Sequence, residues 1–363
     1  MPRIPTYASR PSDTVIRRLP PLLVGIALGA LIAAQAGART PAAAPPSAVD
    51  WLKKNVRAPT RTSYRAAETI TVTVGGRVLR QRLRLVHRAP ESTSWTYLSL
   101  QGKVERIVVD SQRSHWQYLP RRGQIIFSPS FPVDQELWQE RYLGRLLENY
   151  TVRDAGKTLA AGRPARLLVV APRSGHEGPT KRIWVDAATW ITLKSILVSS
   201  DGRTTVASEL SGLRVEKTIP AAEFAPPANA KKQTVIYERA AVLPLPALAR
   251  QWRHPLLVPH DLPRGYSLES ARLLSRGRRS FVHLRYFDGF NVVSLFEDVS
   301  SSKPPVSRSR RDDSIHGGPA VWHSYPPFHS LSWREQGLKL TLMGDLPRRS
   351  LLGIADGVRR VAR

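Results

Sequence analysis

The sequence predicts an α+β fold that is mainly β, built from antiparallel meanders and divided into two domains. Three observations predict it: strand-like runs that follow one another across short turns, few helical stripes, and a Pro/Ala-rich stretch past the middle of the chain. The segment 149–195 is the clearest example, because Gly156, Gly162 and the run 174–179 separate its strand-like pieces. Those pieces are 150–153, 165–171, 182–185 and 191–198.

The bulk composition excludes several classes of chemistry. With 363 residues and 42% hydrophobic residues, the chain can bury two hydrophobic cores. It contains no cysteine, which excludes disulfides, thiolate metal sites and cysteine nucleophiles. The formal net charge of +27 indicates either an anionic partner or an arginine excess that only reflects codon usage in a GC-rich genome.

The first 38 residues have the pattern of a secretory signal peptide. Arg17 and Arg18 precede the apolar run 22–34, which is shorter than the ~20 residues of a membrane span. Ala36-Gly37-Ala38 offers a small-x-small cleavage site, so we expect a periplasmic protein that is cleaved after Ala38. The alternative is a protein anchored in the membrane by the uncleaved signal.

Export changes the kind of partner that the charge indicates. A basic cytosolic protein suggests nucleic acid, but for an exported one we expect anionic lipid, a lipopolysaccharide-like amphiphile or an acidic protein. We therefore expect no nucleic-acid partner. The oligomeric state is left open.

A Pro/Ala linker at 39–47 leads into the first domain, 48–219, which opens with a short helix. Ser47 caps this helix and Pro59 ends it. Strands then follow from residue 63 to residue 127. A second helix at 133–148 is indicated by an apolar stripe of period ~3.6.

Arginines form the first candidate site, on the strand around residue 82. Leu79, Leu83 and Leu85 fall on one face and the arginines on the other, because side chains alternate along a strand. The arginine face is either an ordinary solvent-facing surface or a surface for an anionic partner. Its residues are Arg80, Arg82, Arg84 and Arg88.

Aromatic residues form the second candidate site. They are either packed in the core or line an apolar cavity that takes an acyl chain or a partner's apolar side chain. The residues are Trp95, Tyr97, Trp116, Tyr118 and Trp138.

A Pro/Ala-rich linker at 220–250 separates the first domain from a second one at 251–363. Asp288-Gly289 joins two strands of this domain in a hairpin, and a polar, charged loop is expected at 300–318. Pro347 opens a final helix whose apolar side includes Leu351, Ile354 and Val358. The remaining strands are expected at 320–324, 331–334 and 338–343.

Motifs of known catalytic chemistry do not occur in the sequence. There is no G-x-S-x-G, H-E-x-x-H, P-loop or G-x-G-x-x-G pattern. His316-Gly317-Gly318 is expected to be a turn. We therefore expect a protein that is not an enzyme, with no catalytic residues, metal or cofactor.

Several segments resemble the MucB/RseB family of periplasmic sigma-E regulatory proteins. The clearest are NYTV at 149–152, AGRPARLLVVAPR at 161–173 and RIWVDAATWITLKS at 182–195. In the C-terminal part, YFDGFNVVSLFED at 286–298 and LTLMGDLPRRSLLGIADGV at 340–358 also fit. The resemblance implies a curved antiparallel half-barrel like LolA and LolB, with helices and an apolar cavity, followed by a smaller α+β domain.

The same resemblance implies a role in sigma factor regulation and the envelope stress response. The protein would bind the extracytoplasmic part of a membrane anti-sigma factor and shield it from proteolysis. Lipid or misfolded envelope components would release that partner. The main alternative is a periplasmic lipid or lipoprotein carrier of LolA type, and an envelope enzyme is a more distant one.

Overall fold

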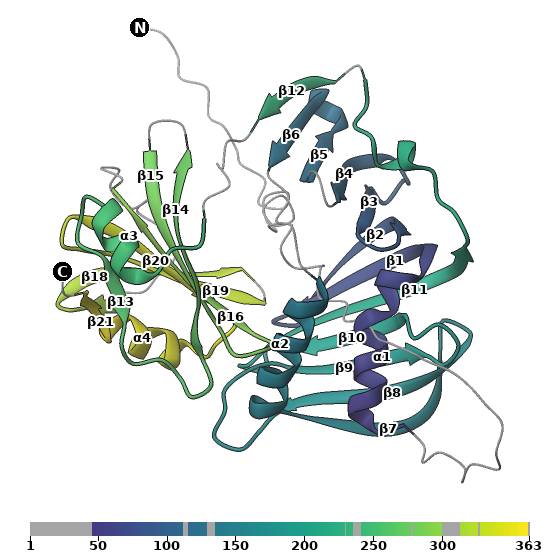
Figure 1. Cartoon of the computed structure of the whole chain (residues 1–363), viewed down its shortest axis with the longest axis horizontal. Coiled ribbons are helices and arrows are strands. Elements are labelled where there is room, and N and C mark those ends of the chain that lie inside the picture. Colours follow the sequence, from purple (N-terminus) through teal and green to yellow (C-terminus); the bar gives the residue numbers. More distant parts are fainter. Residues whose placement is uncertain are drawn as a thin grey trace, which may run out of the picture.

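Two sheets that lie side by side form the body of the protein (Figure 1). The computed structural model describes residues 46–111, 115–128, 135–228, 230–234, 241–276, 279–299, 313–325 and 327–361. The expected signal peptide at 1–38, residues 39–45 of the linker and residues 300–312 of the charged loop lie outside these ranges.

The larger sheet has twelve strands and is curved and open, with β12 at one edge and β7 at the other (Figure 1). Its neighbouring strands are antiparallel, except for the parallel pair of β12 and β6. The strands are β1 (Ser63–Val74), β2 (Arg77–Arg88), β3 (Ser92–Leu98), β4 (Val104–Asp110), β5 (His115–Leu119), β6 (Gln124–Ser128), β7 (Tyr150–Ala160), β8 (Arg163–Pro172), β9 (Thr180–Asp186), β10 (Thr192–Val198), β11 (Thr204–Glu216) and β12 (Lys231–Thr234). The mainly β fold with a curved antiparallel sheet is thus confirmed.

Two helices cover one face of this sheet, which we call the inner face; the opposite one is the outer face (Figure 1). They are α1 (Ala48–Arg61) and α2 (Gln135–Asn149). Their apolar side chains, such as Leu52 and Leu146, pack with Leu168, Val170 and Ile183 of the sheet. Burial of these apolar side chains holds the helices against the sheet.

The prediction that Pro59 ends the first helix is wrong, because α1 continues to Arg61. Proline removes one backbone donor and crowds the carbonyl group four residues earlier, but Pro59 lies in the last turn, so the helix has to continue for only two more residues. The N–H of Thr62 donates to Ala58, and the Pro59 carbonyl oxygen lies 2.7 Å from Nε2 of His87. The end of α1 is therefore held both by a bond within the helix and by a contact with β2.

The smaller sheet has seven strands and a core of its own. Its strands are β14 (Ser267–Arg276), β15 (Arg279–Phe287), β16 (Val292–Asp298), β17 (Asp313–Ile315), β18 (Gly318–Tyr325), β19 (Phe328–Glu335) and β20 (Leu338–Gly344). A short pair, β13 (Leu257–Pro259) and β21 (Val358–Arg360), lies beside it, together with α3 (Leu245–Gln251) and α4 (Arg348–Asp356).

Parts of the linker predicted at 220–250 pack on one sheet or the other. The 3₁₀ helix η4 (Ala221–Phe224) buries Phe224 against the larger sheet, and β12 pairs with β6. In contrast, Leu248 of α3 lies in the core of the smaller sheet.

Two details of the C-terminal half differ from expectation. The end of the predicted charged loop forms β17, because Asp313 and Ile315 pair with β18 across the turn at His316 and Gly317. Val358 lies in β21 instead of the last helix, which ends at Asp356. Both corrections concern strands of only three residues, β17 and β21, which are too short to show a clear alternation in the sequence.

A buried acid in the smaller sheet predicts a pH-dependent stability. Glu297 is 0% exposed, and burial raises the pKa of its carboxyl from 4.5 to about 8. The folded chain therefore holds a proton that the unfolded chain releases above pH 4.5, so stability declines as pH rises from about 4.5 to about 8.

Glu297→Gln should flatten this decline and leave the protein more stable than the parent at pH 8, by on the order of 3 kcal/mol. The measurement is the free energy of unfolding in urea at several pH values. Glu105→Gln, at an exposed position on β4, serves as the control. Equal slopes for the Glu297→Gln variant and the parent would contradict a neutral Glu297.

Candidate functional site

The arginines of β2 lie on the outer face. Arg82 pairs with Leu98 and Arg84 with Thr96, while Leu83 and Leu85 are buried on the inner face as expected. Leu79 lies on the same face, because the register of β1 and β2 is unbroken, but it is 36% exposed where β2 extends beyond the last residue of β3. Arg80, Arg82 and Arg84 are exposed, whereas Arg88 is half-buried with its Cζ atom 5.1 Å from the centre of the Phe224 ring.

The five aromatic residues do not form one wall. Trp95 and Tyr97 pair with Leu85 and Leu83, so they lie half-buried on the inner face. Trp116 and Tyr118 lie on the outer face, since Trp116 pairs with Val109, which pairs with Ser94. Trp138 lies on α2, and its side chain is outside the described part of the structure.

Trp116 and Tyr118 belong to a separate cluster under the chain that follows the larger sheet. Trp116 is 2% exposed and packs with Ile219 and Phe224. Its indole N–H donates to the Phe224 carbonyl oxygen at 3.2 Å. These contacts give Trp116 a structural role. Of the predicted aromatic residues whose side chains the structure describes, Trp95 and Tyr97 are the two that lie on the inner face.

Glu68, Leu83, Tyr97 and Arg106 form a row across the inner face. Glu68 is buried and accepts a hydrogen bond from Ser208; burial raises the pKa of its carboxyl. The guanidinium carbon of Arg106 lies 4.2 Å from the centre of the Tyr97 ring. This row puts the cation of Arg106 and the aromatic ring of Tyr97 beside the apolar side chain of Leu83, an arrangement that suits an amphipathic ligand.

Lys181 of β9 is a further inner-face residue, and sequence reasoning missed it. It pairs with Val170 and Leu197, and burial lowers the pKa of its ammonium group to about 8. The described part of the chain gives it no hydrogen bond or ion pair. The available signal was its spacing of two residues from Ile183 and four from Val185, because those residues define the buried face of the same strand.

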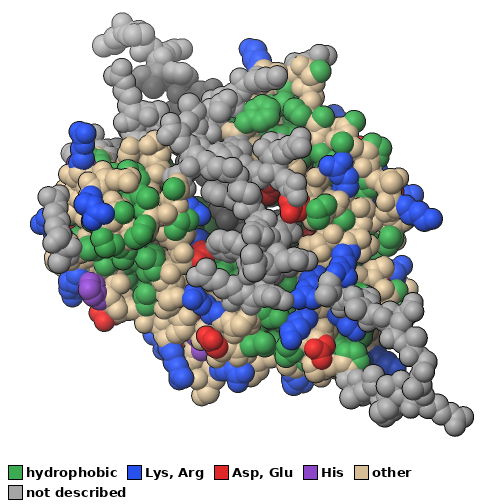
Figure 2. Space-filling model, viewed as in Figure 1, with side chains coloured by type: hydrophobic (Ala, Val, Ile, Leu, Met, Phe, Trp, Pro, Cys, Tyr) green, Lys and Arg blue, Asp and Glu red, His purple; other side chains and the backbone are tan. Residues whose placement is uncertain are grey.

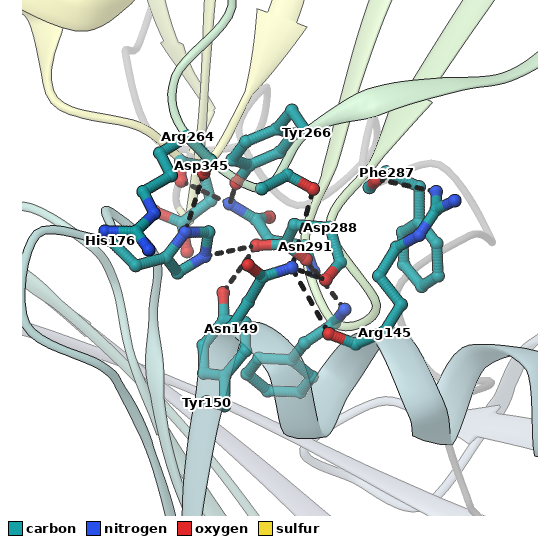
Figure 3. Close-up of polar contacts among 12 residues, drawn as sticks. Arg145, Asn149, Tyr150, His176, Arg264, Tyr266, Phe287, Asp288, Asn291 and Asp345 are labelled. Carbon is teal, nitrogen blue, oxygen red and sulfur yellow. Dashed lines mark hydrogen bonds and ion pairs between the residues drawn. The ribbon is translucent and has the colours of Figure 1, made fainter.

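The two sheets are joined through a buried polar network centred on Asp288 (Figure 3). The Tyr150 hydroxyl donates to Oδ2 of Asp288 at 2.7 Å, and Nε2 of His176 lies 2.8 Å from the same oxygen. Nδ1 of His176 lies 2.8 Å from the carbonyl oxygen of Arg264. Both ring nitrogens thus face oxygen atoms, so the buried ring of His176 is held between the Asp288 carboxylate and the Arg264 carbonyl group.

Both oxygens of the Asp288 carboxylate are satisfied. Its Oδ1 accepts from the backbone N–H groups of Phe290 at 2.7 Å and Asn291 at 2.5 Å. The amide of Asn149, at the end of α2, donates to the Asp288 carbonyl oxygen at 2.7 Å. The side chains of His176 and Asp288 are 2% and 0% exposed, so this pair is fully desolvated.

Two outer contacts extend this junction. The backbone N–H and hydroxyl of Ser200 both donate to Oδ1 of Asp345 at 2.9 Å, and burial raises the pKa of that carboxyl to about 6. Glu177 accepts hydrogen bonds from Arg349 and Ser350 in the first turn of α4. The smaller sheet is thereby fixed against α2, the loop before β9 and the β10–β11 hairpin.

Neither a metal centre nor a membrane span is found within the described ranges. No group of three or more His, Asp or Glu side chains there could hold a metal ion. No described helix is long and apolar enough to cross a bilayer. Lys and Arg side chains are spread over the visible face of both sheets (Figure 2).

The fold and site define a class: a protein with an open, curved sheet whose inner face is apolar, joined by buried polar contacts to a smaller sheet. Residues 47–228 match the MucB/RseB N-terminal domain. The chain therefore belongs to the MucB/RseB family, and the resemblance read from the sequence is confirmed.

Solved structures agree with this assignment at the level of the fold. The crystal structure of MucB in complex with MucA(peri) aligns with a TM-score of 0.58 and 18% identity, over 87% of this chain and all (100%) of that chain. The Pseudomonas aeruginosa MucA/MucB complex gives 0.58 and 19%, over 87% and 99% of the two chains. MucB alone gives 0.51 and 17%, over 86% and 98%. No curated protein sequence matches the chain.

Proposed function

We propose that this protein is an exported, periplasmic regulator that binds the extracytoplasmic part of a membrane anti-sigma factor. Membership of the MucB/RseB family supports this role, as do the similar MucB structures solved with MucA. The observation that carries the proposal is the inner face, where Trp95 and Tyr97 lie half-buried and Lys181 has no partner among the described residues.

The inner face has the chemistry to hold an amphipathic acidic segment. Apolar side chains of the partner would be buried against Trp95, Leu83 and Leu85, and this burial would contribute ~25 cal/mol to the binding free energy per Å² of apolar area. A partner carboxylate would pair with Lys181 and so compensate the cost of burying its charge. A bound segment would be shielded from proteases because its backbone is covered.

Lipid responsiveness follows if an amphiphile binds the same face. A ligand that excludes the partner lowers the affinity for the partner by linkage, and the partner lowers the affinity for the ligand equally. The apolar inner face also fits the alternative of a LolA-type lipid or lipoprotein carrier. A carrier would bind the amphiphile but capture no anti-sigma factor.

Lys181→Gln provides the test. We expect affinity for the captured partner to fall about tenfold, since a buried charge pair is lost. The variant should remain at least as stable as the parent in urea unfolding, because a desolvated charge is removed. The partner is captured from membranes on the immobilised chain that starts at residue 39, identified by mass spectrometry and then titrated by calorimetry.

The neighbouring Arg182→Gln is the matched control, because Arg182 is exposed and points to the outer face. It should leave the affinity unchanged. Capture of lipid without any anti-sigma-like membrane protein would favour the carrier, and capture of neither would reject both functions. An affinity of the Lys181→Gln variant equal to that of the parent would remove Lys181 from the site.

A further inference from the structure

Three aliphatic side chains are exposed at the ends of two neighbouring hairpins of the larger sheet. Val78 is 52% exposed, Leu79 36% and Leu100 80%. Val78 and Leu79 are the second and third residues of β2, after the β1–β2 turn, and Leu100 lies in the β3–β4 turn. The two turns lie at the same end of the sheet, because alternate turns of an antiparallel meander do so.

The two hairpin ends form one continuous surface. Arg82 pairs with Leu98, and its guanidinium donates to the Leu100 carbonyl oxygen at 2.7 Å. The β3–β4 turn is thereby held beside the first residues of β2. Val78 lies on the outer face and Leu79 on the inner face, because side chains alternate along β2, so the hairpin ends carry exposed apolar side chains on both faces. We call these three exposed side chains the apolar patch, and exposed apolar surface of this kind marks an interaction site.

Exposed cations surround the apolar patch. The segments 75–84 and 98–104 contain five basic residues and no acid: Arg77, Arg80, Arg82, Arg84 and Lys103. All five are exposed, and none has an ion pair within the described part of the chain. The next turn at this end of the sheet adds the exposed Arg121 and Arg122.

We propose that the ends of the β1–β2 and β3–β4 hairpins form a docking surface for an anionic lipid bilayer. The guanidinium groups bind phosphate oxygens of the headgroups, for which their planar geometry is suited. Val78, Leu79 and Leu100 insert at the level of the headgroups and the upper acyl chains, where removal of apolar surface from water is favourable.

A bilayer fits this surface better than a nucleic acid does. Single-stranded nucleic acids are bound through aromatic side chains on which bases stack, whereas the patch is aliphatic. Near an anionic bilayer, every one to two cations raise the affinity for the bilayer about tenfold. Docking at this surface does not depend on the inner face or on the identity of the protein partner.

Flotation with lipid vesicles tests the docking surface. The chain that starts at residue 39 retains every residue that the structure describes and lacks the apolar run 22–34, which could itself bind lipid. We expect binding to phosphatidylcholine vesicles that contain roughly 30% phosphatidylglycerol and none to phosphatidylcholine alone. Binding should weaken as salt rises, because the Debye length shortens.

Variants separate the cationic from the apolar contribution. Arg80→Glu, Arg82→Glu and Arg84→Glu together should weaken binding by about 100-fold. Leu100→Ser should weaken it by about fivefold. Leu159→Ser is the matched control, because Leu159 is 72% exposed at the distant β7 edge, and it should bind as the parent does.

The absence of cysteine permits a direct measurement in an otherwise unchanged chain. Leu100→Cys, labelled with an environment-sensitive dye, should show a blue-shifted emission on the anionic vesicles, and labelled Leu159→Cys should not. No binding to the anionic vesicles, or equal shifts at the two positions, would overturn the proposal. So would vesicle binding that the arginine variants leave unchanged, and arginine variants that lose only the protein partner would assign the surface to that partner instead.

Discussion

Gly289→Ala is expected to destabilise the protein by about 3 kcal/mol or more and to loosen the contact between its two sheets. Gly289 has φ +102°, a left-handed conformation that side chains disfavour. An added Cβ would lie 2.3 Å from the backbone nitrogen of Leu146 and 2.6 Å from the carbonyl carbon of Arg145. Because these atoms belong to the backbone of α2, the helix would have to move. Urea unfolding measures the loss.

Gly317→Ala separates the conformational cost from the clash. Gly317 has φ +78°, but no heavy atom lies within 4 Å of the position its Cβ would take. Its replacement should cost only about 1 kcal/mol. Equal stability of the two alanine variants would contradict the close approach of α2 to the β15–β16 turn.

Asp288→Ala is expected to cost about 4 kcal/mol, because it removes a buried carboxylate that the His176 ring contacts at 2.8 Å. The change also leaves the Tyr150 hydroxyl and the backbone N–H groups of Phe290 and Asn291 without their acceptor. The free energy of unfolding in urea measures the loss.

Lys194→Met is the matched control for the loss of an ion pair. The side chains of Lys194 and Glu209 are 30% and 45% exposed, so their pair should be worth no more than about 1 kcal/mol. An Asp288→Ala variant as stable as the Lys194→Met variant would contradict the buried network around Asp288. A double-mutant cycle with His176→Ala then gives the coupling of His176 to Asp288 itself.

Local patterns in the sequence predicted much of the fold. The Asp288-Gly289 turn does join β15 and β16, and the alternation around Arg82 places Leu83 and Leu85 on the buried side. These predictions succeed because turn geometry and strand alternation depend on neighbouring residues. The errors at Pro59 and Val358 arose where a contact with another element overrides the local preference.

The candidate site was less predictable, because it depends on strand register. Trp95 and Trp116 lie on opposite faces of one sheet, and only the pairing of β3, β4 and β5 decides this. Lys181 followed the alternation of its strand, but nothing in the sequence indicated that its neighbours across the sheet would be Val170 and Leu197. The environment that lowers the pKa of Lys181 is therefore a property of the assembled sheet.

By itself, the sequence determined the strands and turns, the mainly β class and the resemblance to the MucB/RseB family. The tertiary structure alone decided which side chains meet at the inner face and how the smaller sheet is attached. Asp288 illustrates the reason: as a turn residue it was recognisable, but its partners Tyr150 and His176 lie 138 and 112 residues away in the sequence. Local propensity acts between neighbouring residues, whereas a buried polar contact forms only when distant segments of the chain come together and exclude water from it.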